Sequence, residues 1–267
     1  MGWQLRDWVS DIMHLEVCID SVESGIAAER GGAQRVELCS DLLEGGITPG
    51  AGMIASVRRH IGIDLYVMIR PRGGDFCYTP FEFEVMRDEI DHARRLGADG
   101  VVLGILDELG RVDVPRTRQL VELADPLPVT FHRAIDMTPD LSVALRDILE
   151  TGARRILTSG GQPNAMLGSG EIARLVEEAR GRIGIMPGGG ISAENIHAIV
   201  EATGATEFHA SARTPIPSPV LFRKSEVAMG DIPDQEYSRF IAREDTVRAL
   251  VGALERLSAE RGAVQPR

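Results

Sequence analysis

The sequence predicts an α/β protein, a single-domain (β/α)8 TIM barrel, on three observations. Eight short β-rich runs alternate with helical segments, and their starts lie roughly 20 to 36 residues apart, the length of one βα unit. Apolar and polar side chains alternate along the runs, and no GxGxxG motif occurs early in the chain. A doubly wound open sheet alternates strands and helices in the same way, but the count of eight favours the barrel.

The predicted strands are short runs of β-forming residues. In chain order they cover residues 14–20, 35–39, 64–70, 100–106, 128–134, 154–160, 182–188 and 206–212. Helical periodicity is clearest over residues 21–32, 79–98, 169–181 and 192–204. Several of these segments begin at Ser or Thr, as helix N-caps do, and end at Gly, as helix stops do.

Side-chain alternation favours a barrel over an open sheet. Successive strand residues point to opposite sides, and a sheet buried between two layers of helices would be apolar on both faces. Here one face is apolar, and we expect it to contact helices through Leu15, Val17, Val36, Leu38, Val67 and Phe208. The other face is predicted to point into the barrel and carries Glu16, Cys18, Glu37, Cys39, Arg70, Thr130, His132, Glu207, His209 and Ser211.

Length and charge limit the classes of function. The 267 residues, 43% of them hydrophobic, are enough for one sizeable core, and we expect a barrel domain over residues 13–267 behind an N-terminal extension over residues 1–12. The net charge of −11 repels phosphate and anionic lipid, so we expect neither a nucleic-acid nor a membrane partner. Without a signal peptide or a long apolar run, and with three widely spaced cysteines, the sequence is typical of a cytoplasmic protein.

Charged residues gather near the predicted carboxyl ends of the strands, where (β/α)8 barrels place their active sites. One interpretation is an ion-pair network inside the barrel, in which Arg70 and Arg72 neutralise Glu16 and Glu37. The other is a pocket in which the two arginines, with Asp75 on the same loop, bind a carboxylate or phosphate. In that pocket the acids and bases would be Glu16, Glu37, His132 and His209.

A glycine-rich loop after the seventh strand supports the second interpretation. Gly188, Gly189 and Gly190 could bring backbone N–H groups close to a small anionic ligand, and Ser211 and Arg213 follow the eighth strand. The loop could equally be only a tight turn. Since neither a Walker motif nor a dinucleotide fingerprint occurs, no nucleotide cofactor is indicated.

Several long motifs carry a resemblance to a known family. They are "LEVCIDSVESGIAAERGGAQRVELCS", "EGGITPG", "MIRPRGGDFCY", "LPVTFHRAIDM", "RILTSGG", "MPGGGIS" and "TEFHASAR". Together they resemble the CutC family, the so-called copper homeostasis proteins, over roughly residues 13 to 250. The resemblance implies a cytoplasmic TIM barrel that assembles as a homo-oligomer and has a role in copper homeostasis.

The resemblance also implies that Cys18 and Cys39 bind Cu(I). Thiolates are suitable ligands for Cu(I), but two small buried cysteines that only fill a layer of the barrel are an equally simple interpretation. The alternative function is that of an enzyme, with acid and base chemistry of the lyase, isomerase or hydrolase type on a small anionic or sugar-like molecule. For the homo-oligomer, the proline-rich segment over residues 215–231 is the candidate contact.

Overall fold

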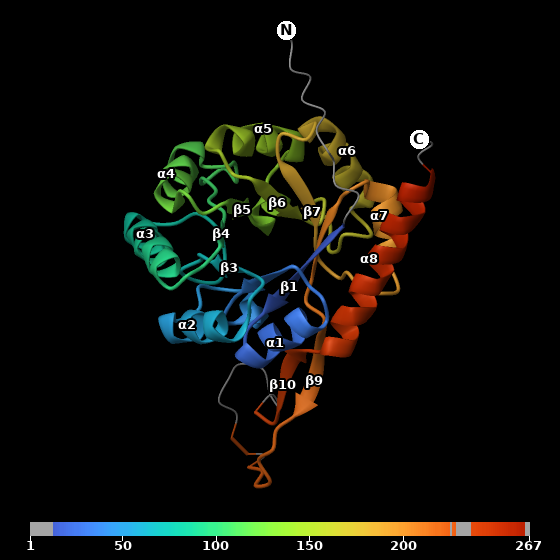
Figure 1. Ribbon diagram of the computed structural model, residues 1–267. Coiled ribbons are helices and arrows are strands. Elements are labelled where there is room, and N and C mark those ends of the chain that lie inside the picture. Colours follow the sequence, from blue (N-terminus) through green and yellow to red (C-terminus); the bar gives the residue numbers. More distant parts are fainter. Residues whose placement is uncertain (1–12, 225, 228–235, 265–267) are drawn as a thin grey trace.

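The computed structural model describes residues 13–224, 226–227 and 236–264, and it confirms the (β/α)8 barrel (Figure 1). The N-terminal extension predicted over residues 1–12 lies outside the described residues, as does part of the segment predicted to make the subunit contact. The barrel strands are β1 (His14–Ile19), β2 (Arg35–Leu38), β3 (Asp64–Met68), β4 (Gly100–Leu103), β5 (Val129–Phe131), β6 (Arg155–Thr158), β7 (Gly184–Pro187) and β8 (Glu207–Ala210).

Helices surround the strands in Figure 1 and follow them in turn along the chain. They are α1 (Val22–Arg30), α2 (Ala51–His60), α3 (Pro80–Arg95), α4 (Val114–Ala124), α5 (Leu141–Thr151), α6 (Ser169–Ala179), α7 (Ile196–Thr203) and α8 (Glu244–Val264). Short 3₁₀ helices, η1 (Leu42–Glu44) and η2 (Arg133–Met137), follow β2 and β5. Among the described residues, no helix has both the length and the apolar character that a membrane span requires.

All neighbouring barrel strands pair in parallel. The hydrogen-bonded order is β7-β6-β5-β4-β3-β2-β1-β8, and a single bridge between Gly188 and His209 joins the two ends of this order. In the register, Glu16 lies opposite Arg35 of β2 and opposite His209 of β8. Strands that lie far apart in the sequence therefore bring charged side chains together inside the barrel.

The predicted alternation of the strands is confirmed. The six residues expected on the outer face all belong to the main apolar core, where they are buried together with helix residues such as Ile54, Met86 and Ile90. A separate inner cluster contains Cys18, Cys39, Tyr66, Met68 and Val102. The outer face is apolar because it packs on helices, whereas the inner face is free to carry polar groups.

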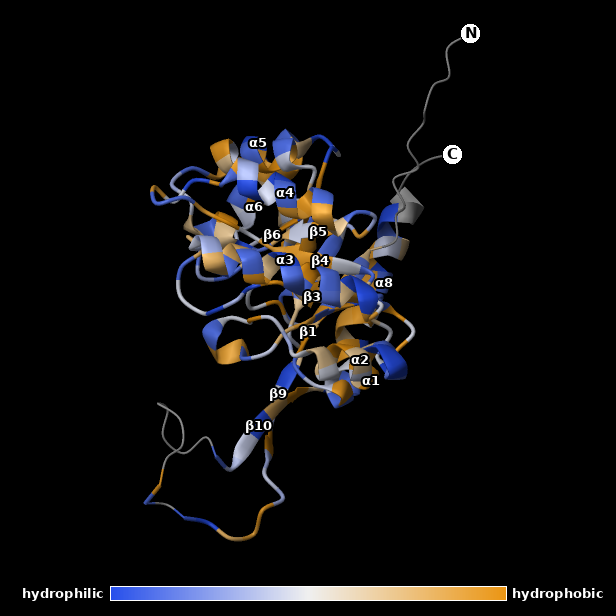
Figure 2. Ribbon diagram, turned by 90° about the vertical axis from the view of Figure 1, so that its left-hand side faces the viewer, coloured by the Kyte–Doolittle hydropathy of each residue, from blue (hydrophilic) through white to orange (hydrophobic). Residues whose placement is uncertain are grey.

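A two-stranded arm projects from the barrel. It consists of β9 (Arg213–Pro217) and β10 (Ser238–Ala242), which pair in an antiparallel ladder directly after β8. Figure 2 shows the arm extending away from the barrel, and residues beyond β9 include the exposed Leu221 and Phe222. The sequence pattern did not predict these strands, because β9 contains two prolines and does not alternate between apolar and polar residues.

Candidate functional site

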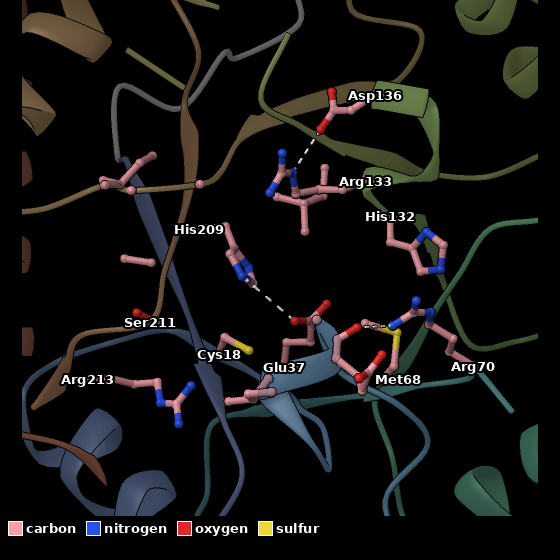
Figure 3. A pocket seen from close by; sticks show the side chains of 18 of the residues that line it. Cys18, Glu37, Met68, Arg70, His132, Arg133, Asp136, His209, Ser211 and Arg213 are labelled. Atoms are coloured by element: carbon pink, nitrogen blue, oxygen red, sulfur yellow. Dashed lines mark hydrogen bonds and ion pairs between the residues drawn. The ribbon is translucent and has the colours of Figure 1, made fainter. Parts of the chain in front are cut away.

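A cavity of about 470 Å³ opens at the carboxyl ends of the barrel strands. Figure 3 shows His132, Arg133, Arg70, Glu37 and His209 around it. Nine of the residues predicted for a site line this cavity: Cys18, Glu37, Arg70, His132, Gly189, Gly190, His209, Ser211 and Arg213. The structure therefore brings together most of the groups that the sequence placed near strand ends.

Beneath the cavity lies a layer of ion pairs, as one of the two interpretations of the sequence expected, but with other arginines. Arg35 donates to the carboxylate of Glu16 and, over 2.7 Å, to Glu207, which also accepts from Arg155 over 2.6 Å. Burial would raise the pKa of Glu16, but Arg35 and His209 outweigh it and lower the pKa to about 2. The expectation that Arg70 and Arg72 neutralise Glu16 is wrong, because Arg35 lies directly opposite Glu16 in the register.

Two cysteines lie side by side at the base of the cavity, Cys18 in its floor and Cys39 just beneath it. The Sγ atoms of Cys18 and Cys39 are 4.0 Å apart, and both residues are buried. The neighbouring thiol of Cys39 lowers the pKa of Cys18 to about 5, against the effect of burial and with the help of His209. The same contact, together with burial, holds the pKa of Cys39 well above its ordinary value of 9.0. Cys18 is therefore the thiol that ionises first.

Glu37 and His209 complete the floor. His209 donates from Nδ1 to Glu16 over 2.7 Å, and its Nε2 lies 3.8 Å from Oε2 of Glu37. Burial alone would lower the pKa of His209, but Glu37, Cys18 and Glu16 together raise it well above 6.5. Burial and the Cys18 thiolate raise the pKa of Glu37 well above 4.5, and its Oε1 has no hydrogen-bond partner. Cys18, Glu37 and Cys39 form one group that could hold a metal ion.

Arg70 and His132 form one wall of the cavity. Arg70 is only 5% exposed, and its guanidinium donates to the backbone oxygens of Glu44, Gly46 and Gly74 over 2.7 to 2.9 Å. His132 accepts a hydrogen bond at Nδ1 from the N–H of Ala134 over 3.2 Å. Burial, reinforced by the charge of Arg70, lowers the pKa of His132 to about 3. The imidazole is therefore neutral and carries its proton on Nε2.

Next to His132, the cavity lining contains residues that were missing from the predicted site (Figure 3). Arg133 donates from Nε to Asp136 over 2.8 Å and from Nη2 to Ser159 over 2.7 Å. Gly189 and Gly190 lie beside it with φ angles of +99° and +71°, which favour glycine. Arg133 and Asp136 belong to η2, directly after β5, and the polar letters of "HRAID" at a strand end were the signal for them.

Comparison with known proteins gives the family. The model of the CutC family matches residues 13–214. The chain belongs to the CutC family. A mouse copper homeostasis protein cutC homolog is 51% identical over 237 residues, 88% of this chain and 87% of the relative. A CutC family protein of Chromobacterium violaceum is 48% identical over 242 residues, 91% of this chain and 98% of the relative.

Solved structures agree with this assignment. The structure of a copper homeostasis protein CutC from Streptococcus agalactiae is 35% identical, with a TM-score of 0.72 over 75% of this chain and 99% of that chain. A thiamine phosphate pyrophosphorylase from Pyrococcus furiosus, 18% identical with a TM-score of 0.56, covers 92% of this chain and 96% of its own. At that identity the second likeness shows the fold alone.

Five residues predicted for the site do not line the CutC cavity. Glu16 and Cys39 are buried beneath its floor, and Gly188 is in the wall, where an added Cβ would lie 2.4 Å from Leu157. Arg72 donates to Glu82 over 2.6 Å and to Asp75 over 3.1 Å, away from the cavity. The two arginines of "RPRG" therefore differ in role, because only Arg70, two residues after the end of β3, lines the cavity.

Proposed function

We propose that this CutC chain binds one Cu(I) between Cys18 and Cys39 and so takes part in copper homeostasis. The observation that carries the proposal is the 4.0 Å separation of the two buried Sγ atoms, which come from neighbouring strands. Soft thiolates are the ligands that select Cu(I) over harder cations. The names of the mouse and human relatives, which refer to copper homeostasis, support the same function.

The geometry of the cysteine pair fits a two-thiolate site. With metal–sulfur bonds of about 2.3 Å, as in zinc thiolates, a linear site would separate the sulfurs by about 4.6 Å. The pair would therefore need to open by only about half an ångström from its present separation. Cys18 lines the cavity and so gives the ion a route from solvent, while Glu37 lies 3.6 Å from Cys39.

Binding would release protons, because thiols ligate metals as thiolates. Cys18 is already acidic, so the proton of Cys39 is the one that the metal must displace. The carboxyl of Glu37 accepts the Cys39 S–H and could receive this proton. The pair thus offers two soft thiolate ligands of the kind that selects Cu(I).

An anaerobic titration tests this proposal. Cu(I) delivered from a chelator of known affinity should saturate at about one ion per chain, and Cys18→Ser or Cys39→Ser should each weaken binding by several orders of magnitude, because one thiolate cannot hold the ion alone. Cys77→Ser is the matched control, since Cys77 lies on the loop after β3, outside the cavity lining. Unchanged affinity in the double variant of Cys18 and Cys39 would contradict the proposal.

A further inference from the structure

We propose that the cavity above the cysteine pair binds a small hydroxylated organic anion, a carboxylate or phosphate ester, through Arg70, His132 and Arg133. This site goes beyond copper binding and does not depend on it, since none of the three residues contacts either cysteine through a described hydrogen bond. Three features of the cavity wall carry the inference.

The first feature is a concentration of unpaired polar atoms. Among the described residues, six buried side-chain nitrogen or oxygen atoms have no hydrogen-bond partner. Four belong to residues that line this one cavity: Glu37 Oε1, Arg70 Nε, His132 Nε2 and Arg213 Nε. Folded proteins leave few such atoms, and each one costs stability. Their gathering around one hollow indicates a missing partner rather than scattered packing faults.

The second feature is a buried positive charge without a negative neighbour. Arg35 is paired with two carboxylates and Arg133 with one, but no ion pair involves Arg70 within the described part of the chain. Its hydrogen bonds go to neutral backbone oxygens, which fix the guanidinium in place without cancelling its charge. Because an unpaired buried charge is costly, an anion in the cavity would stabilise this wall.

The third feature is a set of hydrogen-bond donors around the cavity. The neutral His132 carries an unpaired N–H at Nε2 beside Arg70. The side chain of Arg133, the next residue in the chain, is 43% exposed, and Asp136 and Ser159 hold its Nε and Nη2. Its remaining nitrogen, Nη1, lies 3.5 Å from where a Cβ on Gly189 would be. A glycine at that position keeps the nitrogen accessible.

These features define the chemistry of the ligand. Nitrogen donors from Arg70, His132 and Arg133 require oxygen acceptors on the molecule, and the unpaired carboxyl oxygen of Glu37 on the floor is suited to a hydroxyl group. Phe76, Leu157 and Ile191 offer apolar surface for a short carbon skeleton, and about 470 Å³ is enough for a small metabolite. The chain has one lysine, Lys224, which lies beyond β9, so the barrel has no amine for a Schiff base with a carbonyl substrate.

Thermal shift and calorimetry with the metal-free full chain test the site. One arm uses ribose 5-phosphate and glucose 6-phosphate, and the other uses gluconate and ribonate, so that phosphate and carboxylate are distinguished. Ribose and glucose are the uncharged controls, and inorganic phosphate is the control without a sugar. We expect one anionic arm to raise the melting temperature by mass action, while the neutral sugars have no effect.

Variants locate the binding. Arg133→Gln and His132→Phe should each weaken binding of the active anion roughly ten- to a hundredfold. Each substitution removes a hydrogen-bond donor and leaves an acceptor of the bound ligand without a partner. Arg72→Gln is the matched control, since Arg72 lies two residues from Arg70 but pairs with Glu82 outside the cavity. Arg133→Gln keeps the test valid even if a variant of Arg70, which is bound to three loop carbonyls, fails to fold.

The outcomes separate this site from the copper site. The double variant Cys18→Ser, Cys39→Ser should keep the anion affinity of the parent within a few-fold while losing Cu(I). The inference is overturned if no compound in either arm stabilises the parent, or if Arg133→Gln and His132→Phe bind as tightly as Arg72→Gln.

Discussion

Glu16 is a buried carboxylate whose charge depends on its neighbours. It accepts from Arg35 and from His209, and no part of it is exposed. Its residue type and strand position were predicted, but its partner was not. Arg35 has the same parity as Glu37 and so points inward, yet it stands at the start of its strand, where the sequence alone suggests an exposed end. The register with β1 and β8, which no local pattern contains, decides the pairing.

The stability of the metal-free protein should therefore depend on Glu16 at acid pH. The folded-state pKa of about 2 lies below the ordinary value of 4.5, so the carboxylate contributes stability that is fully present above pH 4.5 and is lost as the pH falls toward 2. This difference corresponds to roughly 3 kcal/mol. We expect Glu16→Gln to remove that part of the acid dependence, measured as the free energy of unfolding in urea between pH 6 and pH 2.5.

The pKa shift of His209 makes stability depend on pH in the opposite direction. Its pKa is raised in the folded state, so its contribution is fully present below pH 6.5 and is lost as the pH rises through the folded-state value. Glu16→Gln also removes the negative charge that pairs with His209 and Arg35, so the variant should be less stable than the parent at neutral pH as well. A variant that loses as much stability as the parent between pH 6 and pH 2.5 would contradict the assignment.

At the scale of elements, a glycine in a strand and a glycine in a helix are present for different structural reasons. Gly100 begins β4 with its Cα facing the barrel interior, and an added Cβ would lie 2.5 to 2.7 Å from the ring of Tyr66. Gly252 lies inside α8, where a Cβ would meet only Arg256 Nη1 at an ordinary 3.5 Å. The first glycine makes room for a side chain, whereas the second has no packing role.

Alanine at the two positions should therefore change stability in opposite directions. We expect Gly100→Ala to destabilise the protein by about 1 to 3 kcal/mol through overpacking. Gly252→Ala should stabilise it by up to about 1 kcal/mol through helix propensity. Urea denaturation of both variants checks the pair, and equal effects of the same sign would show that the interior around Tyr66 is looser than the structure indicates.

Strand number and facing were predictable from the sequence, but strand ends were not. The sixth strand was predicted over residues 154–160, whereas β6 is Arg155–Thr158, and the fourth extends only to Leu103. Apolar residues can continue beyond the last residue that pairs with a neighbouring strand. Alternation therefore cannot show where the loops around the cavity begin. For the same reason the prediction found His132 at the end of β5 but missed Arg133 and Asp136, which belong to a 3₁₀ turn without a strand face.

At the scale of the whole molecule, the arm presents apolar side chains to solvent. Leu221 is 96% exposed and Phe222 is 74% exposed, and the ladder of β9 and β10 holds this segment away from the barrel (Figure 2). Contiguous exposed apolar side chains, unlike single ones, often mark contact surfaces. We propose that they contact another copy of the chain, in agreement with the homo-oligomer that the sequence led us to expect.

Light scattering tests the assembly. The parent should have a mass that is a multiple of 29.0 kDa, and Leu221→Asp together with Phe222→Asp should shift it toward the single chain, because buried charges oppose association. Val143→Asp, at an exposed apolar residue of α5, is the matched control. A parent that stays at 29.0 kDa over a wide concentration range would overturn the expectation.

The single bridge between Gly188 and His209 makes one seam of the barrel weaker than the others. Elsewhere neighbouring strands share a ladder, but between β7 and β8 this bridge is the one pairing that the described residues make. Local opening should therefore begin there, and the amides near this seam should exchange with deuterium faster than those of β1 and β2. Because Gly189 and Ser211 continue from the two sides of the seam into the cavity, a molecule bound against both would hold it shut. Binding would then be visible as slower exchange at residues that the ligand never touches.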